Sequence, residues 1–503
     1  MSSSASYRRI AKNTLFLYLR MVVVMGVSLY TVRAVLHQLG VVDYGIYNVV
    51  GGVVNMFSFL NGTLSTSSQR YFSIEIAKGD KERLNQWFCL NITSFSIFII
   101  LFLFIAETVG LWFVNTQMTI PAERLFAANV VYQFSIISFC VHFINIPYNA
   151  LIIAHERMSA FAYISIIDAV LKLAIVYFLS ISTWDKLVVY GFLMFLLSCS
   201  ITSAYIIYCL RRFKESKYHP YWNTSEIKEL LGFSGWHFLG TFAVVTRSQA
   251  INILLNLFFN PAINAARAIA FQVYKAVNQL SSNFFVAVRP QIFKSYATGD
   301  NEELYKLIMR STTMCSFLVS ILVYPILANT AYILGLWLKE VPDYAVIFTQ
   351  LVLINGLIDA TNGPTIAPAF ATGKIRNYQL VVSFLIFLNL PISYIALKLG
   401  CEPTVTMKVS ISLSLVTAIV RAYLLRSMIG LPFGKYLILF FRIVVVSLFI
   451  WGVISLIKNN EANSFVSLLG RSTIIAVLVV VSYFSMVMER NDLRAVINYV
   501  RRR

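Results

Sequence analysis

Apolar residues in this chain gather in long runs that are separated by short polar or charged segments. A helix needs about 20 mostly apolar residues to cross the ~30 Å hydrocarbon core of a bilayer. Runs of that kind lie at 13–36, 43–68, 87–110, 125–153, 158–181, 187–210, 231–258, 264–288, 308–336, 343–371, 377–398, 405–428, 436–457 and 466–488. The pattern therefore predicts an all-α integral membrane protein with about 14 transmembrane helices.

The composition supports a membrane protein and excludes a chain of soluble domains. Hydrophobic residues make up 58% of the 503 residues, charged residues make up 13%, and the mean hydropathy is +0.73. A soluble protein carries roughly 25% charged residues, so a soluble protein of this composition could not cover its surface. The six cysteines are scattered, mostly inside apolar runs, and their spacing suits neither a metal site nor a disulfide framework.

Basic residues are distributed unevenly between the segments that join the runs, and this asymmetry predicts the topology. With a cytoplasmic N-terminus and alternating spans, most loop lysines and arginines fall on the cytoplasmic side, including 211–228 and the tail Arg501–Arg503. The opposite face receives only Arg124, Lys186, Lys339, Lys398 and Lys458. We therefore expect both termini in the cytoplasm, and we interpret the net charge of +19 as this bias, with no nucleic-acid partner.

Two segments 220 residues apart resemble each other and indicate an internal duplication. Residues 77–84 read AKGDKERL and residues 297–304 read ATGDNEEL, each after a polar-flecked apolar run. Six spans separate the copies, so the two units run in the same direction through the membrane. We expect an N-terminal six-helix bundle at 1–210, a basic linker at 211–230, a second six-helix bundle at 231–430, and two extra transmembrane helices with a basic tail at 431–503.

Charged side chains inside spans cost roughly 2.5–3.5 kcal/mol each, so they usually face protein or water. Several have simple explanations: Arg33, Glu107 and Arg267 lie near the outer ends of their spans, and Asp168 and Lys172 are spaced to neutralise each other. Arg20, Arg247 and Lys275 lie in the leading spans of the two repeats with no carboxylate beside them in sequence.

These cations predict a cavity between the duplicated bundles that binds an anionic substrate, since arginine pairs with phosphate through two parallel hydrogen bonds. We assign substrate binding to Arg20, Arg247 and Lys275, with Arg267 extending the site outward. Asp168 and Asp359 are candidates for carrying a coupling ion, although a structural role explains each equally well. The prolines and glycine at Gly363-Pro364, Pro368 and Pro325 predict breaks in the ninth and tenth spans, as hinges or as static kinks.

The sequence contains no P-loop, no histidine spacing that suits a metal and no arrangement typical of a hydrolase. External loops are too short for a catalytic domain. We therefore expect a transporter without a cofactor or a metal, and not an enzyme.

The stretch 39–72, followed by AKGD, and the FSGW at 233–236 resemble the Wzx-type polysaccharide flippases. That family belongs to the multidrug/oligosaccharidyl-lipid/polysaccharide (MOP) exporter superfamily, together with the MATE drug exporters. The resemblance implies a MATE-like, V-shaped fold in a bacterial inner membrane. It also implies translocation of undecaprenyl-diphosphate-linked oligosaccharides by alternating access for surface polysaccharide synthesis, beside a polysaccharide polymerase and chain-length proteins.

Two other functions remain open from the sequence. A MATE-like, cation-coupled drug exporter would need acidic residues in its cavity, whereas the first two spans contain no Asp or Glu inside them and cations dominate. A membrane glycan polymerase or ligase would need a substantial external loop, which the pattern of spans does not provide.

Overall fold

The structure is a computed structural model that describes residues 3–55, 59–116, 118, 120–259, 261–338, 341–457 and 464–488. Lys339, Lys458 and the basic tail, for which topology was predicted, lie outside these residues. The described residues form helices and no strands, which confirms the predicted all-α class. The α-helices are α1 (Ser3–Asn55), α2 (Phe59–Lys78), α3 (Lys81–Ile105), α4 (Leu111–Thr116), α5 (Leu125–Ala154), α6 (Met158–Ile181), α7 (Lys186–Arg212), α8 (Thr224–Phe258), α9 (Pro261–Ala297), α10 (Asn301–Ala328), α11 (Thr330–Trp337), α12 (Ala345–Asn362), α13 (Ile366–Ala371), α14 (Arg376–Phe387), α15 (Asn389–Lys398), α16 (Val405–Ile429), α17 (Phe433–Ile457) and α18 (Phe465–Met486).

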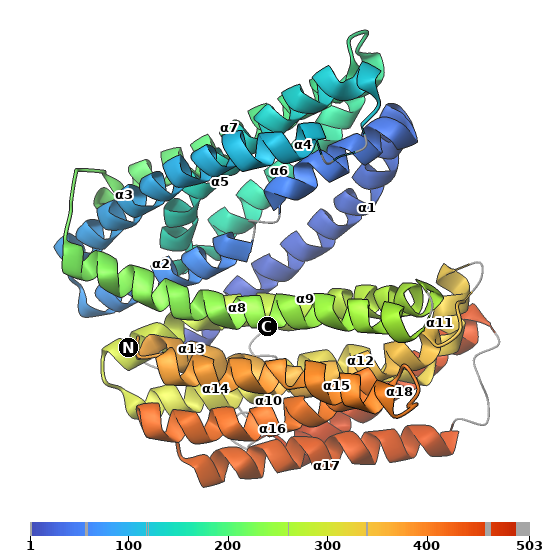
Figure 1. Ribbon diagram of the computed structural model, residues 1–503. Coiled ribbons are helices and arrows are strands. Elements are labelled where there is room, and N and C mark those ends of the chain that lie inside the picture. The colour runs from blue at the N-terminus through green and yellow to red at the C-terminus, as the bar shows by residue number, and fades with distance from the viewer. Residues whose placement is uncertain are drawn as a thin grey trace. The chain divides into compact units, whose positions relative to one another are not determined.

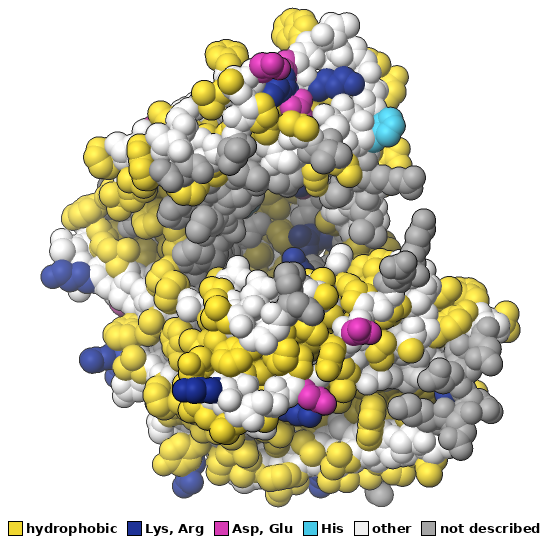
Figure 2. All heavy atoms as spheres, turned by 45° about the vertical axis from the view of Figure 1, so that its right-hand side comes forward, with side chains coloured by type: hydrophobic (Ala, Val, Ile, Leu, Met, Phe, Trp, Pro, Cys, Tyr) yellow, Lys and Arg dark blue, Asp and Glu magenta, His cyan; other side chains and the backbone are white. Residues whose placement is uncertain are grey.

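Eleven helical stretches in the described part of the chain are long and apolar enough to cross a membrane. The other three expected spans, 13–36, 43–68 and 264–288, fall in α1, α2 and α9; they are helical apart from residues 56–58, which are not described. Figure 2 shows hydrophobic side chains spread widely over the face that it draws, with charged side chains at few places. An apolar outer surface of this kind fits a protein whose solvent is lipid.

The chain divides into two compact units, Met1–Phe238 and Leu239–Arg503, and the division falls inside α8. In the first unit α5 packs against α7 and α2, and α1 packs against α6 (Figure 1). In the second unit α9, α10 and α12 pack against one another, and α16 packs against α12. The bundles bury aromatic rings such as Phe88 and Phe143 in the first unit and Phe348 in the second.

The last two helices belong to the core of the second unit. Val446 and Val479 pack in one apolar cluster with Val323 of α10. The hydroxyl of Tyr483 lies 2.7 Å from Ser316 Oγ, and the hydroxyl of Tyr436 donates to the Thr361 carbonyl at 3.1 Å. These buried hydrogen bonds join α17 and α18 to the helices of the second unit, so the pair is more than an appendage to the bundle.

The duplicated loop motif has the same backbone geometry in both units. Gly79 ends α2 with φ 77° and Gly299 ends α9 with φ 72°. In each copy the glycine N–H bonds the carbonyl three residues back, and the aspartate N–H bonds the carbonyl five residues back. This is a Schellman cap, which needs a left-handed residue at the glycine position.

The aspartate of the motif begins the next helix. The carboxylates of Asp80 and Asp300 accept hydrogen bonds from the backbone N–H three residues later, at 2.9 and 3.0 Å, and so cap α3 and α10. The leucine that closes the motif, Leu84 or Leu304, is buried in its own unit. The similar sequence therefore encodes one local structure, a glycine stop followed by an aspartate start.

Two predicted breaks lie in the second unit. Residues Gly363–Thr365 form a 3₁₀ turn between α12 and α13. Past Pro325, α10 ends at Ala328, and the side chain of Asn329 donates to the Pro325 carbonyl at 2.9 Å. The locations of the interruptions are therefore confirmed, and the freed backbone groups have local partners.

One arginine ties three helices of the first unit together at one end. Gly40 (φ 76°) kinks α1, and the chain after it brings Asp43 to Arg124 at the start of α5. Arg124 contacts both oxygens of Asp43 at 2.8 and 2.5 Å, and it also contacts Asp185, the residue that caps α7, at 2.5 Å. A bidentate guanidinium pair of this kind fixes direction as well as distance.

We predict that Gly299→Ala destabilises the protein by about 1–2 kcal/mol, because an alanine at φ 72° is strained. No heavy atom would lie within 4 Å of the new methyl group, so the strain of the backbone is the only cost. Thermal unfolding in detergent would measure the change. Gly335→Ala in α11 is the matched control, since that glycine is helical and equally open; equal effects of the two variants would contradict the assignment.

Lowering the pH should weaken the contact between Arg124 and Asp185. Burial raises the pKa of the Asp185 carboxyl, but hydrogen bonds from Arg124 and two backbone N–H groups outweigh it and hold the pKa below its usual range. The ionised carboxylate therefore stabilises the folded protein above its unfolded pKa of about 3.9, and the contribution is lost as the pH falls through the lower folded pKa.

The variant Asp185→Asn keeps a capping oxygen and removes the charge. We expect it to lower the melting temperature at pH 7, and the difference from the parent protein to shrink as the pH is lowered toward 3. Asp343→Asn, which changes an exposed carboxylate before α12, is the control. A difference for Asp185→Asn that is constant over this pH range would show that the carboxylate charge contributes nothing.

Candidate functional site

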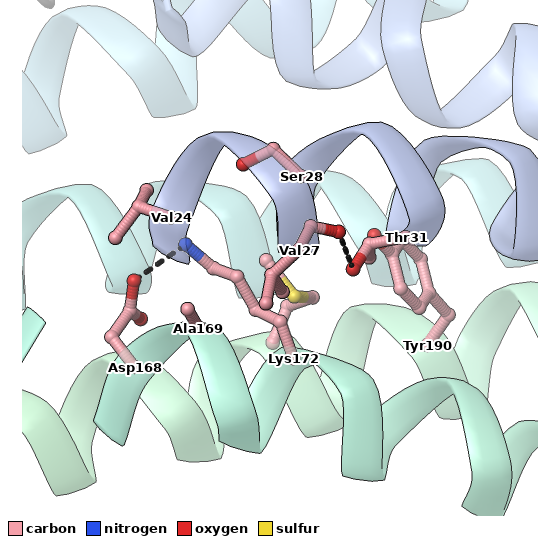
Figure 3. Close-up of a pocket in the computed structure, with 9 residues that line it drawn as sticks. Val24, Val27, Ser28, Thr31, Asp168, Ala169, Lys172 and Tyr190 are labelled. Carbon is pink, nitrogen blue, oxygen red and sulfur yellow. Dashed lines mark hydrogen bonds and ion pairs between the residues drawn. The ribbon is translucent and has the colours of Figure 1, made fainter. Parts of the chain in front are cut away.

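The first unit contains a cavity of about 190 Å³ between α1, α6 and α7. Its floor carries an ion pair, with Lys172 Nζ 2.7 Å from Asp168 Oδ2 (Figure 3). The lining is otherwise apolar and hydroxyl-bearing, with Val24, Val27, Ser28, Thr31, Ala169, Tyr190 and Met194. The cavity is smaller than the 300–1,000 Å³ of typical ligand pockets. The structure thus places Asp168 beside Lys172, the arrangement in which the two charges neutralise each other.

Arg20 lies on α1 in the same unit and is half-buried. Its guanidinium carbon lies 4.5 Å from the centre of the Phe161 ring, and the side chain interacts electrostatically with Tyr205 and Asp168. The sequence shows no carboxylate near Arg20, but the fold brings one from α6. The first unit therefore holds Arg20, Lys172 and one aspartate in a single electrostatic neighbourhood.

The second unit holds a more strongly cationic group. Arg267 on α9 is only 5% exposed, donates a hydrogen bond to Asn252 Oδ1, and stacks over Phe271 at 4.4 Å. Arg247 on α8 is half-buried and repels Arg267 electrostatically. Arg267 is buried by protein, which differs from the explanation that it snorkels to the membrane surface.

Asp359 on α12 interacts electrostatically with Arg247. Its carboxylate accepts hydrogen bonds from Asn355 Nδ2 at 2.8 Å, from the Tyr274 hydroxyl at 3.3 Å and from Ser414 Oγ at 3.4 Å. These partners come from α12, α9 and α16. Arg247 acts electrostatically on Asp359, so the cation that has no acidic neighbour in sequence acquires one in the fold.

Arg421 on α16 belongs to the same group and was missed from the sequence. It interacts electrostatically with Asp359, and its guanidinium donates to the Asn362 carbonyl at 3.4 Å, next to the 3₁₀ turn. The signal was available, because Arg421 falls within the expected span 405–428 and a charged residue there is costly. Arg247 and Arg421 thus act on Asp359 as two positive charges against one negative charge, and Arg247 in turn repels Arg267.

Lys275 does not share the environment of the three arginines. It follows Tyr274, which faces Asp359, and a step of one residue turns the helix by about 100°. The Lys275 side chain is exposed as a result. Arg20 belongs to the first unit, while Arg247, Arg267 and Lys275 belong to the second. Among the described residues, no three His, Cys, Asp or Glu side chains lie close enough to hold a metal ion.

The fold is that of the MATE transporters of the MOP superfamily. An outward-facing multidrug-resistance MATE transporter matches 86% of this chain and 98% of its own length, with a TM-score of 0.69 and 14% identity. A MOP superfamily transporter from Pyrococcus furiosus matches 86% of this chain and 98% of its own length, with a TM-score of 0.67 and 14% identity. ClbM, a MATE transporter in complex with Rb⁺, matches 83% of this chain and 95% of its own length, with a TM-score of 0.68 and 15% identity. No protein-family model matches the sequence, and no curated protein matches it.

These similarities confirm the MATE-like fold that was predicted. At 14–15% identity they establish architecture alone. What the chain transports has to be argued from its own side chains.

We predict that Asp168 and Lys172 are energetically coupled. Lys172→Met alone leaves a carboxylate unpaired beside an apolar cavity, so it should destabilise the protein more than the double change Asp168→Asn with Lys172→Met. A double-mutant cycle of unfolding free energies should give a coupling of roughly 0.5–1 kcal/mol. The exposed pair Glu302 and Lys306 on α10 is the control, with a smaller expected coupling. Additive effects at Asp168 and Lys172 would contradict the prediction.

Proposed function

We propose that this protein transports an anionic, lipid-linked substrate, namely an oligosaccharide joined through a diphosphate to a polyprenyl lipid such as undecaprenol. The observation that carries the proposal is an excess of positive charge in the second unit: Arg247 and Arg421 both act on the carboxylate of Asp359, and Arg267 interacts with Arg247. In this proposal the protein flips the substrate across the bacterial inner membrane for surface polysaccharide synthesis, without catalysing a reaction.

The second unit carries positive charge that its own carboxylate does not balance. Asp359 balances one of the three arginines, and each uncompensated cation at mid-membrane costs roughly 2.5–3.5 kcal/mol. A bound diphosphate would supply the missing negative charge. Arginine is suited to this task, because its planar guanidinium can make two parallel hydrogen bonds to a phosphate.

The three arginines are held differently, and this suggests separate roles. The side chain of Arg267 is fixed by Asn252 and by the Phe271 ring, so it presents a preorganised charge. The Nε atom of Arg267 is buried and makes no hydrogen bond to any residue that the structure describes. Arg247 is more exposed than Arg267, which suits first contact with an arriving headgroup. Arg421 bonds the backbone at Asn362, where a change in the 3₁₀ turn would move it.

The comparisons are compatible with an anionic substrate. The Pyrococcus furiosus transporter is described as having a binding pocket of reverse polarity that suggests a different function. The polarity of a pocket can therefore differ among proteins of this architecture. In the present chain the described charges of the second unit are mainly positive around Asp359, and that favours an anion over a cationic drug.

A cation-coupled exporter of the MATE type is the second candidate, and the environment of Asp359 is the observation that favours it. Three oxygen- or nitrogen-bearing side chains from three helices surround its carboxylate, as in a site that releases and takes up a proton or a monovalent cation. The arginines beside it oppose cation binding. Drug resistance on expression that is lost in Asp359→Asn would favour this candidate over ours.

The proposal predicts that Arg247→Gln slows translocation of a lipid-diphosphate oligosaccharide by roughly tenfold to a hundredfold, the value of one hydrogen bond to a charged group. Purified protein in proteoliposomes, with a fluorescent substrate bleached from outside by a membrane-impermeant reagent, gives the rate. Arg442→Gln is the matched control, because it removes the same charge from an exposed position on α17. Unchanged transport in Arg247→Gln, or equal slowing in Arg442→Gln, would refute the proposed site.

A test in cells addresses the substrate itself. Removing the protein should cause the lipid-linked intermediate to accumulate on the cytoplasmic leaflet. If no such intermediate accumulates, the substrate class is wrong even where the arginines prove necessary for transport of another anion.

A further inference from the structure

The segment between α7 and α8, residues 213–223, is fastened to the surface of the first unit, and we call it the strap. The side-chain amide of Asn85 on α3 donates to the backbone carbonyls of Glu215 and Lys217 at 2.7 and 2.8 Å. About two turns further along α3, Thr93 Oγ1 lies 3.2 Å from the hydroxyl of Tyr218. A short 3₁₀ turn at Lys214–Ser216 leads the chain out of α7. The strap therefore has a defined conformation against α3.

Acidic side chains at the strap turn inward and are paired. Glu215 Oε1 lies 2.9 Å from His155 Nε2, at the end of α5. Glu226, in the first turn of α8, is buried and contacts Arg83 at 2.6 Å. Both carboxylates therefore face groups of the first unit and add little negative charge to the outer surface.

Basic side chains turn outward. The exposed ones are Arg211, Arg212, Lys214, Lys217 and Lys228. The one exposed carboxylate between 211 and 230 is Glu229, which lies 3.9 Å from Arg70. In this segment the fold thus converts a mixed sequence into a surface with five positive charges and one negative charge.

Exposed aromatic rings accompany these charges. The side chains of Tyr218 and Trp222 leave 49% and 59% of their surface exposed. Tyrosine and tryptophan concentrate where a membrane protein passes from hydrocarbon to headgroups, because one end of each ring system is apolar and the other is polar. The strap joins the ends of two membrane-crossing helices, α7 and α8, so it lies near the boundary between the hydrocarbon and the headgroups.

We infer that the strap and its flanking basic residues form a binding surface for the headgroups of anionic phospholipids. Charge complementarity supplies the attraction, while Tyr218 and Trp222 insert at the headgroup level. The basic residues are distributed along 18 residues of chain, from Arg211 to Lys228, which suits several headgroups side by side better than one convergent phosphate site. This surface is independent of the substrate proposed above.

Fluorescence quenching of Trp222 by brominated lipids tests the inference. The purified protein is reconstituted in bilayers that contain brominated phosphatidylglycerol or brominated phosphatidylcholine at equal mole fraction, and the Trp222 signal is the difference from Trp222→Phe. We expect stronger quenching by the anionic lipid. We also expect the preference to fall when the ionic strength rises from about 0.05 M to about 0.5 M, because this change shortens the Debye length roughly threefold.

A matched pair of triple variants separates this surface from positive charge in general. Arg212→Gln, Lys214→Gln and Lys217→Gln together should lower the relative affinity for the anionic lipid by at least about tenfold, since each basic residue near a membrane surface contributes roughly fivefold. Arg426→Gln, Lys374→Gln and Lys435→Gln remove one arginine and two lysines from exposed positions of the second unit. This control should leave quenching of Trp222 unchanged.

Three results would overturn the inference: equal quenching of Trp222 by both lipids, equal loss of preference in the two triple variants, or displacement of the anionic lipid by millimolar inorganic phosphate. The last result would identify a site for free phosphate. Because the salt dependence is measured on the unmodified protein, the inference stays testable if the strap variant fails to fold.

Discussion

The high free-energy cost of a charged group in hydrocarbon is the constraint on which this structure depends. Every charged side chain within a span has to find another group of the protein, reach the water, or hold a ligand. The chain uses the first solution in the cavity of the first unit, where Lys172 contacts Asp168 at 2.7 Å. On α17, by contrast, Arg442 is exposed. The arginines around Asp359 satisfy neither solution completely, and this excess of positive charge is the physical basis of the proposed function.

Aromatic rings and amides complete the solvation of these cations. Arg20 lies over Phe161 and Arg267 over Phe271, each within 4.5 Å of the ring centre. Interactions of this kind stabilise a guanidinium and still leave N–H groups available for an anion. The strap also arranges its charges by their surroundings: its carboxylates face the protein, and its cations face outward. At the strap the fold thus separates charges that are mixed along the sequence.

The duplicated motif shows how a short sequence can specify a local structure twice. Glycine is required at positions 79 and 299 because the backbone there is left-handed, and aspartate follows because the next helix begins with unpaired N–H groups. The buried leucine four residues later joins each turn to its own core. A repeat conserved in this way within one chain supports a common origin of the two units, since each residue has the same physical task in both.

Hydrophobic periodicity and length were sufficient to predict the helices, the membrane environment and the breaks near Pro325 and Gly363, because these properties depend on neighbours along the chain. The sequence also identified Arg247 and Arg267 as costly residues. It could not show that Asp359 lies beside Arg247, or that Arg421 joins them, since these residues are separated by 112 and 62 positions along the chain and meet only through the packing of α8, α12 and α16. The role of Lys275 depends on tertiary structure for a related reason: the rotation of α9 about its axis decides which way a side chain faces, and only contacts with neighbouring helices set that rotation.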